Sequence, residues 1–229
     1  MTHILHLKNL QFSWPGQPPV IELDQLHLAP GEHLFIQGPS GSGKTTLLNL
    51  ITGLQPGYHG AVTVAGRELA RLSSRARDQF RADHMGLLFQ QFNLLPYLNL
   101  VDNVTLPCTL SAARRTTASQ DSGSVDREAE RLLTRLQLPP QLFRQRRTAE
   151  LSIGQQQRVA AARALIGRPA LIIADEPTSA LDHASRDHFI QLLFEELEQS
   201  GSTLLMVSHD PALAARFPRH LQLGAATIC

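Results

Sequence analysis

A glycine-rich run near the amino terminus carries the residues with the clearest chemical potential, and it reads Gly-Pro-Ser-Gly-Ser-Gly-Lys-Thr. The run fits the phosphate-binding pattern G-x-x-x-x-G-K-S/T. Its glycines let successive backbone N–H groups converge on phosphate oxygens. Its lysine can reach the β- and γ-phosphates of a nucleotide, and its threonine hydroxyl can ligate Mg²⁺. The candidate phosphate-binding residues are Gly38, Pro39, Ser40, Gly41, Ser42, Gly43, Lys44, Thr45 and Thr46.

The segments on either side of this run favour the phosphate-binding interpretation over a simple glycine-rich turn with an exposed lysine. A short strand is predicted at His33–Gln37, directly before the run, and a helical pattern covers Leu47–Thr52 after it, with Gly53 as its stop. The start of that helix would add its positive end to the site.

Acidic and imidazole side chains follow two apolar strands in the carboxyl-terminal part. Asp175 and Glu176 end the predicted strand Leu171–Ala174. Asp175 is suited to hold Mg²⁺ through water, and Glu176 can orient or deprotonate an attacking water. Strands often end in acids, so the pair gains meaning only beside the phosphate loop. The strand Thr203–Val207 leads to His209, which is either a γ-phosphate contact or a structural histidine.

Further segments resemble the ATP-binding-cassette family, and they follow the family's order over nearly the whole chain. Leu151–Gln155 reads L-S-I-G-Q, which is similar to the signature L-S-G-G-Q, and the helix after it is also similar. Gln90 resembles the Q-loop glutamine, Asp182 the D-loop aspartate and His209 the switch histidine. Trp14 stands where the family carries an aromatic residue that stacks on adenine.

The resemblance implies an enzyme that binds and hydrolyses ATP with Mg²⁺. The catalytic residues that it implies are Lys44, Gln90, Glu176 and His209. The metal-binding residues that it implies are Thr45, Gln90 and Asp175.

In the family the signature grips the γ-phosphate of ATP on the opposite subunit, so one chain holds two half-sites. The residues implied for this second half-site are Ser152, Gly154, Gln155 and Asp182. Ser152 opens a helix, which suits an anion. One departure is Ile153, which replaces the first signature glycine. A β-branched residue resists a positive φ, so if the loop requires one there, we expect weaker nucleotide sandwiching and reduced activity.

The alternation of strands and helices predicts an α/β fold with a mainly parallel sheet. With the resemblance, we expect a P-loop NTPase core, an N-terminal antiparallel β subdomain and an inserted α-helical subdomain. A single domain would cover 1–229, with the core in 1–92 and 151–229 and the insert in 93–150. Inside the insert, Ala112–Ser124 is rich in Ser, Thr, Ala and Gly and predicts a loop.

Other expected elements complete this pattern. The further strands are Leu23–Leu28, Ala61–Val64 and Met85–Phe89, and the further helices are Gln155–Ile166 and Ser185–Gln199.

Composition sets the remaining limits. The chain has 229 residues, 42% of them hydrophobic, and a net charge of +1, so no global basic field argues for a nucleic-acid partner. The two cysteines have no metal-ligand spacing and fit a reducing cytosol, with Cys108 packed and Cys229 incidental. No apolar run is long enough to span a bilayer, and Met1–Leu10 is not a signal peptide.

Two segments look most like the lipoprotein-release, macrolide-export and cell-division branch of the family, namely Phe92–Pro96 and Ala174–Thr178. This implies a cytoplasmic ATPase, peripheral on the inner face of the membrane, that pairs with a second ATPase subunit, expected to be a second copy, and with an integral-membrane permease. One alternative is a soluble protein acting on ribosomes or DNA, which the single cassette and the lack of a basic tail disfavour. Another is a regulatory cell-division ATPase, which Ile153 keeps open.

Several arginines could touch a permease or lipid headgroups, but scattered arginines usually belong to solvated helix surface, which we expect here. They are Arg114, Arg115, Arg144, Arg146 and Arg147.

Overall fold

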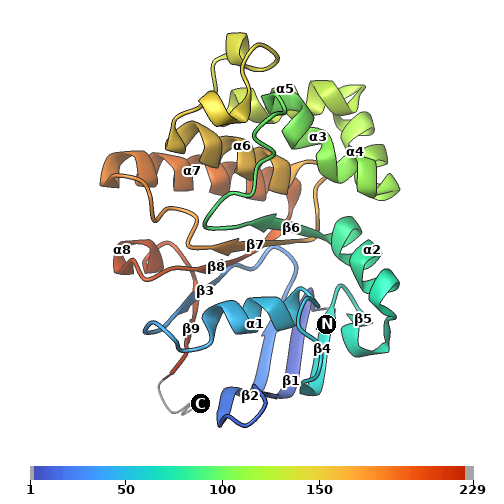
Figure 1. Ribbon diagram of the computed structural model, residues 1–229, viewed down its shortest axis with the longest axis vertical. Helices are drawn as coiled ribbons and strands as arrows, with labels where there is room; N and C mark the ends of the chain where they lie inside the picture. Colours follow the sequence, from blue (N-terminus) through green and yellow to red (C-terminus); the bar gives the residue numbers. More distant parts are fainter. Residues whose placement is uncertain (1–2, 225–229) are drawn as a thin grey trace.

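Two β-sheets of different type form the frame of the molecule in the computed structural model, which describes residues 3–224 (Figure 1). Cys229 lies outside the described residues. The first sheet is antiparallel, with strand order β2-β1-β4-β5. Its strands are β1 (Leu5–Ser13), β2 (Pro19–Leu28), β4 (His59–Val64) and β5 (Arg67–Glu68). This is the N-terminal antiparallel sheet that the sequence predicted.

The second sheet is parallel throughout, with strand order β6-β7-β8-β3-β9. Its strands are β3 (Leu34–Gln37), β6 (Met85–Leu88), β7 (Leu171–Asp175), β8 (Thr203–Val207) and β9 (Arg219–Gln222). Because all strands run the same way, their carboxyl ends lie at one edge of the sheet. The phosphate loop after β3, the acids after β7 and the histidine after β8 therefore emerge together.

Helices cover the parallel sheet and extend above it. They are α1 (Lys44–Ile51), α2 (Ser74–His84), α3 (Leu100–Leu110), α4 (Ala112–Ser122), α5 (Val125–Arg135), α6 (Ile153–Leu165), α7 (His183–Ser200) and α8 (Pro211–Ala214). Three short 3₁₀ turns are η1 (Leu69–Arg71), η2 (Pro140–Leu142) and η3 (Thr148–Glu150). Both α1 and α6 begin a few residues before the expected positions.

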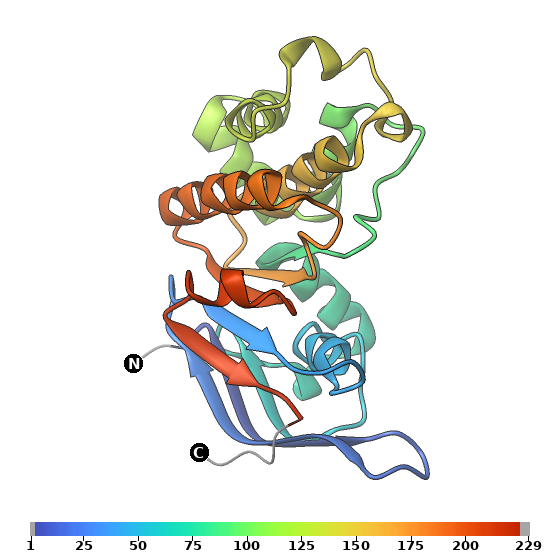
Figure 2. The same ribbon diagram turned by 90° about the vertical axis from the view of Figure 1, so that its left-hand side faces the viewer.

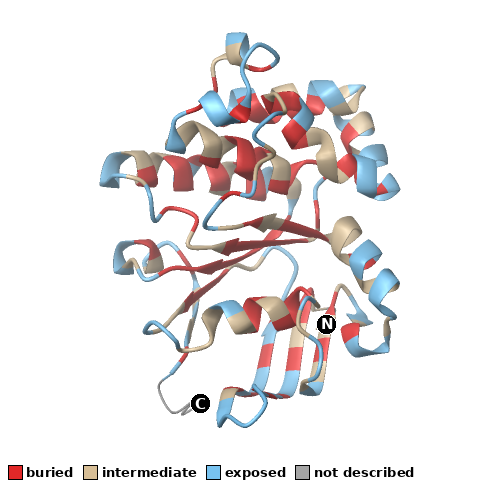
Figure 3. Ribbon diagram, in the orientation of Figure 1, coloured by how far each residue is buried: buried red, intermediate tan, exposed pale blue. Residues whose placement is uncertain are grey.

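Side-chain alternation along the parallel strands divides the core into two clusters. On β3, Leu34 and Ile36 pack with α1 and the antiparallel sheet, whereas Phe35 between them packs with α6 and α7. Figure 1 accordingly shows α1 and α6 on opposite sides of the parallel sheet, and Figure 2 shows the same layers from the side. The central strands are buried along nearly their whole length (Figure 3).

The predicted loop at Ala112–Ser124 is wrong, because most of it forms α4. The Ser111 side chain caps the helix by accepting the Arg114 N–H at 3.0 Å. The hydroxyls of Thr116 and Thr117 donate to carbonyls four residues earlier, at 2.9 and 3.2 Å. These residues satisfy their polar groups inside the helix, so a Ser- and Thr-rich composition does not force a loop here.

The expectation of solvated arginines is wrong for Arg114, which is buried. Its guanidinium donates to the carbonyl oxygens of Met85 in β6 at 3.2 Å and of Ala164 and Ile166 at the end of α6, at 2.9 and 2.8 Å. The other four arginines of that group are exposed. Arg144 among them pairs with acidic residues of α5.

Candidate nucleotide-binding site

The loop between β3 and α1 has the backbone of a phosphate cradle. Gly41 and Gly43 have φ of +79° and +90°, in the left-handed region that glycine adopts at no steric cost. A Cβ at Gly43 would lie 2.8 Å from the Ile21 side chain and 2.9 Å from that of Val20. The loop thus requires glycine here both for its turn and for its approach to β2.

Polar groups of this loop turn inward. Lys44 is the first residue of α1, and its Nζ donates to the carbonyl oxygens of Gly38 at 2.7 Å and Pro39 at 2.9 Å. Ser42 Oγ is buried and has no hydrogen-bond partner among the described residues. A buried hydroxyl without a partner is costly unless a ligand satisfies it. The loop therefore fits an anion that would accept hydrogen bonds from both the Lys44 ammonium and the Ser42 hydroxyl.

Oxygen ligands meet beside the loop. Thr45 Oγ1 lies 3.4 Å from Asp175 Oδ2, at the end of β7. Burial raises the pKa of Asp175, the adjacent charge of Glu176 raises it further, and the Thr45 hydrogen bond and the Lys44 charge oppose both. A hydroxyl and a partly buried carboxylate next to a phosphate cradle match the oxygen ligands that Mg²⁺ prefers.

The candidate base is held by the neighbouring strand. The Glu176 backbone N–H donates to Val207 O at 2.9 Å, and the residue has a φ of +47°. Its Oε2 lies 2.9 Å from His209 Nδ1 and 3.3 Å from Ser208 Oγ. An ionised carboxylate only accepts hydrogen bonds, so both neighbours donate to it. A non-glycine residue in this region costs about 1–3 kcal/mol, and such strain clusters at functional sites.

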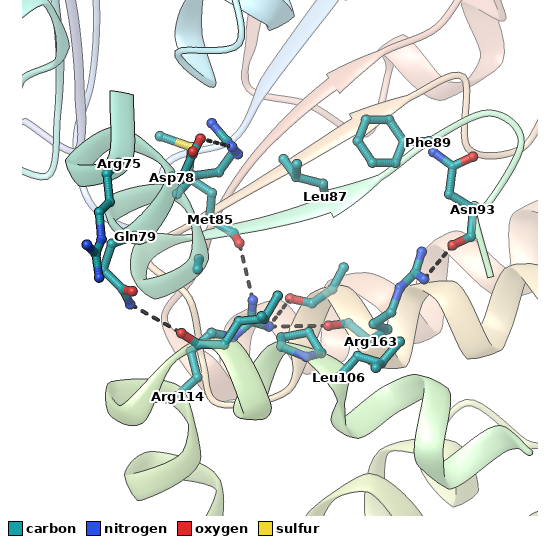
Figure 4. A pocket seen from close by; sticks show the side chains of 15 residues that line it. Arg75, Asp78, Gln79, Met85, Leu87, Phe89, Asn93, Leu106, Arg114 and Arg163 are labelled. Carbon is teal, nitrogen blue, oxygen red and sulfur yellow. Dashed lines mark hydrogen bonds and ion pairs between the residues drawn. The ribbon is translucent and has the colours of Figure 1, made fainter. Parts of the chain in front are cut away.

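Gln90 is exposed just after β6. Phe92 and Asn93, two and three residues later, have φ of +57° and +50°. Arg163 of α6 donates to the carbonyl oxygens of both residues, at 2.7 Å for Asn93 (Figure 4). Sequence reasoning missed Arg163, because nothing in a helical pattern marks one arginine as a contact to a distant loop.

The signature segment forms the start of α6. Ser152 is the N-cap, with its Oγ accepting the Gln155 N–H at 3.3 Å, while Gln155 Oε1 accepts the Ser152 N–H at 3.0 Å. This capping box leaves the Ser152 O–H free to donate. Ile153 is the first helical residue, lacks a positive φ and is 55% exposed. We expected Ile153 to weaken the site if the loop required a positive φ at this position. The position has no positive φ here, so that condition is not met.

Asp182 caps α7 and is exposed. Its carboxylate accepts the Ser185 N–H at 2.9 Å and the Ser185 hydroxyl at 2.8 Å, and these bonds lower its pKa. Leu181 beside it lies near Gly154, where a Cβ would be 3.5 Å from the Leu181 side chain. The signature and Asp182 thus form one surface, on the opposite side of the parallel sheet from α1 (Figure 1).

Trp14 follows the end of β1 and is 40% exposed. Its ring meets that of buried Phe12 edge to face, at 4.9 Å between centroids and 87° between planes. Part of the indole therefore packs on Phe12, and 40% of the residue stays exposed to a ligand. Stacking on adenine stays a prediction.

Comparisons with known proteins agree with this geometry. A family model described as ABC transporter matches residues 22–179. The uncharacterized ABC transporter ATP-binding protein YbbA of Escherichia coli K12 is 40% identical over 97% of this chain and 94% of its own. The lipoprotein-releasing system ATP-binding protein LolD of Novosphingobium aromaticivorans is 38% identical over 86% of this chain and 84% of its own.

The macrolide export ATP-binding/permease protein MacB of Shigella flexneri is 37% identical over 97% of this chain, which spans 33% of MacB. The predicted likeness to lipoprotein-release and macrolide-export proteins is thus confirmed. Among solved structures, the dimeric post-hydrolysis state of the ATP-binding cassette MJ0796 bound to ADP and Pi has a TM-score of 0.82 and 34% identity, covering 96% of this chain and 94% of that chain. No helix within residues 3–224 is long and apolar enough to cross a membrane.

Proposed function

Because the chain belongs to the ABC transporter family, we propose that it binds and hydrolyses MgATP between two copies of itself and so drives a separate membrane permease. The observation that carries this proposal is the meeting of the Lys44 loop, Asp175, Glu176 and His209 at one edge of the parallel sheet. The protein would act at the inner face of the membrane, where the permease holds it.

The chain's own residues account for the chemistry. Lys44 would exchange its two carbonyl contacts for phosphate oxygens, and the orphaned Ser42 hydroxyl would gain a partner. Thr45 and Asp175 would hold Mg²⁺, which supplies charge neutralisation on the phosphates when bound. Glu176 would orient the attacking water and accept its proton. With Nδ1 donating to Glu176, His209 would donate to the γ-phosphate through Nε2 as an imidazolium, in which both ring nitrogens carry a hydrogen.

A second copy is required for a complete site. The phosphate loop precedes α1 on one side of the parallel sheet, whereas the signature opens α6 on the other side. The free Ser152 O–H and the positive end of α6 are therefore available to the γ-phosphate of a partner chain. The dimeric MJ0796 cassette, which binds ADP and phosphate, supports this arrangement.

A groove of about 570 Å³ lies between α2 and β6 on one side and α3 and α6 on the other (Figure 4). Its apolar walls include Leu87, Phe89 and Leu106, and Leu110 at its rim is 68% exposed. Phe89 directly precedes Gln90, so an occupant would contact the strand end that carries the Q-loop. We assign this groove to a short cytoplasmic segment of the permease, because an apolar occupant would cover Leu110 and reach the nucleotide site.

ATP hydrolysis by the purified chain, compared with Glu176→Gln, tests the proposal. Gln keeps the size of the side chain and cannot take a proton, so turnover should stop while calorimetry still detects ATP binding. The variant should accumulate as an ATP-bound dimer in light scattering. Hydrolysis at the wild-type rate by Glu176→Gln would remove Glu176 as the base.

A further inference from the structure

Arg186 is an almost completely buried arginine, with a side chain 8% exposed, in the first turn of α7. Its backbone N–H donates to Asp182 O at 2.9 Å. Its guanidinium donates to Asp210 Oδ2 through Nη1 and to Asp187 Oδ1 through Nε at 3.0 Å. Burying a guanidinium is costly unless it is paired, so these two carboxylates must compensate the charge.

Asp210 connects this ion pair to the nucleotide site. It directly follows His209, and its backbone N–H donates to Ser208 Oγ at 3.2 Å. The Ser208 hydroxyl, having accepted this bond, donates its own hydrogen to Glu176 Oε2 at 3.3 Å. Asp210 Oδ1 accepts the Ala212 N–H at 2.9 Å and so caps α8. Asp210 is therefore held by three partners. Its carboxylate oxygens bind Arg186 and the Ala212 N–H, and its own N–H binds Ser208.

A continuous path of hydrogen bonds thus runs from α7 to the candidate base. It begins at Arg186, passes through Asp210 and Ser208 and ends on the Glu176 carboxylate. His209 lies in the same turn and contacts the same carboxylate oxygen. The start of α7 carries Asp182 on the surface that we assign to the second copy. The path therefore joins that surface to the base.

We propose that Arg186 is a positioning residue, which holds the turn 208–210 so that Ser208 and His209 orient the Glu176 carboxylate. The inference rests on the proposed role of Glu176. It adds that the orientation of the base depends on the position of the first turn of α7. A shift of Asp182 against the second copy would then be transmitted to Glu176 through the side chains of Arg186, Asp210 and Ser208.

Steady-state ATP hydrolysis by Arg186→Ala and Asp210→Asn tests the inference. Loss of a positioning contact misplaces the base, so kcat should fall about tenfold or more. The KM and the calorimetric affinity for ATP should stay within about twofold, because neither residue is part of the phosphate cradle. Arg186→Lys keeps the charge but offers a single contact point, so kcat should be partly restored. Retained ATP affinity also shows that each variant is folded.

The matched control is Asp187→Asn, which removes the other carboxylate on the same guanidinium. Its side chain is 50% exposed and, among the described residues, makes no hydrogen bond or ion pair with the turn 208–210. The kcat of this variant should match that of the wild type within about twofold. A loss as large as that of Asp210→Asn would indicate a general effect on the fold of α7 and would overturn the inference.

A fall in kcat at an unchanged KM, partly restored by Arg186→Lys, is a readout that a loss of structure alone would not give.

The Glu176→Gln arm separates this inference from the proposed function. If Glu176→Gln abolishes hydrolysis but Arg186→Ala and Asp210→Asn keep a wild-type kcat, the positioning role is overturned and the base assignment stands. If Glu176→Gln hydrolyses ATP at the wild-type rate, the base assignment fails and this inference fails with it.

Discussion

Lys44 and Lys8 are the only lysines of the chain, and they lie in different surroundings. Lys44 donates to two carbonyl oxygens inside the phosphate loop, whereas Lys8 is exposed on β1. Lys44→Ala should remove nearly all nucleotide affinity and leave the fold intact. Charge-assisted hydrogen bonds contribute about 1.5–3 kcal/mol each, so the loss of two corresponds to about a hundredfold or more in Kd. Calorimetry with ATP measures it.

Lys8→Ala provides the matched control, because it removes the same positive charge from an exposed strand position outside the phosphate loop. Its ATP affinity should equal that of the wild type. An unchanged affinity in Lys44→Ala would contradict the assignment of the phosphate loop.

Trp14 is the single tryptophan of the chain, so tryptophan emission reports one position. If its open side stacks on adenine, ATP and ADP should both change the emission, and inorganic triphosphate should change it far less. Stacking on a base contributes about 1–3 kcal/mol in nucleic-acid sites, so Trp14→Ala should weaken ATP binding several-fold. Trp14→Tyr should largely preserve the affinity.

The edge contact with Phe12 offers the competing account, in which Trp14 only covers the end of β1. Equal emission changes with ATP and triphosphate, together with unchanged ATP affinity in Trp14→Ala, would support packing alone.

At the scale of elements, the buried side chain of Arg114 ties α4 to the core through several hydrogen bonds. Arg114 binds carbonyl oxygens of β6 and of the last turn of α6, and burial lowers its pKa to about 10. Arg114→Ala would leave several buried carbonyls without donors, each costing about 1–3 kcal/mol, partly offset by water that enters. We therefore expect a loss of about 2–4 kcal/mol in the free energy of unfolding, measured by urea denaturation.

Arg115 is the neighbouring arginine on the same helix and is exposed. Arg115→Ala should change the free energy of unfolding by less than about 0.5 kcal/mol. Similar values for the two variants would show that Arg114 is not what holds α4.

At the scale of the whole molecule, the helical backbone of Ile153 decides how substitutions at this position affect dimerisation. In a Glu176→Gln background, Ile153→Ala keeps a good helix former and should leave the ATP concentration for half-maximal dimerisation within about twofold. Ile153→Gly should raise that concentration, because glycine costs up to about 1 kcal/mol in a helix relative to alanine. Light scattering at increasing ATP measures both. A lower ATP requirement with glycine would show that the working loop does need a positive φ.

The groove beside Gln90 gives a prediction about the membrane partner. Leu110→Glu places a charge at the rim of this groove and should reduce the fraction of protein that sediments with membranes of the native host. ATP hydrolysis by the isolated chain should be unchanged. Leu54→Glu, at an exposed apolar residue outside the groove, is the control and should sediment normally. Equal sedimentation of Leu110→Glu and the wild type, or binding of the wild type to protein-free vesicles of the same lipids, would contradict a permease in the groove.

The sequence by itself determined the parts of this protein that depend on neighbouring residues. The phosphate loop around Lys44 is a local backbone conformation that its glycines permit, and Asp175 and Glu176 follow a strand whose apolar residues mark its burial. Parallel strands end at one edge, so the meeting of these groups with His209 could also be predicted. Caps are local as well, which is why Ser152 was expected at a helix start.

Only the tertiary structure decided which distant side chains meet, because such contacts depend on packing across layers and not on the spacing of residues. Arg114, Arg163 and Arg186 look alike in the sequence, as arginines in helical segments. In the fold each reaches polar groups of another element: the end of α6 for Arg114, the Q-loop backbone for Arg163 and the turn after β8 for Arg186. Their partners lie 24 to 70 residues away, beyond any helical or strand period.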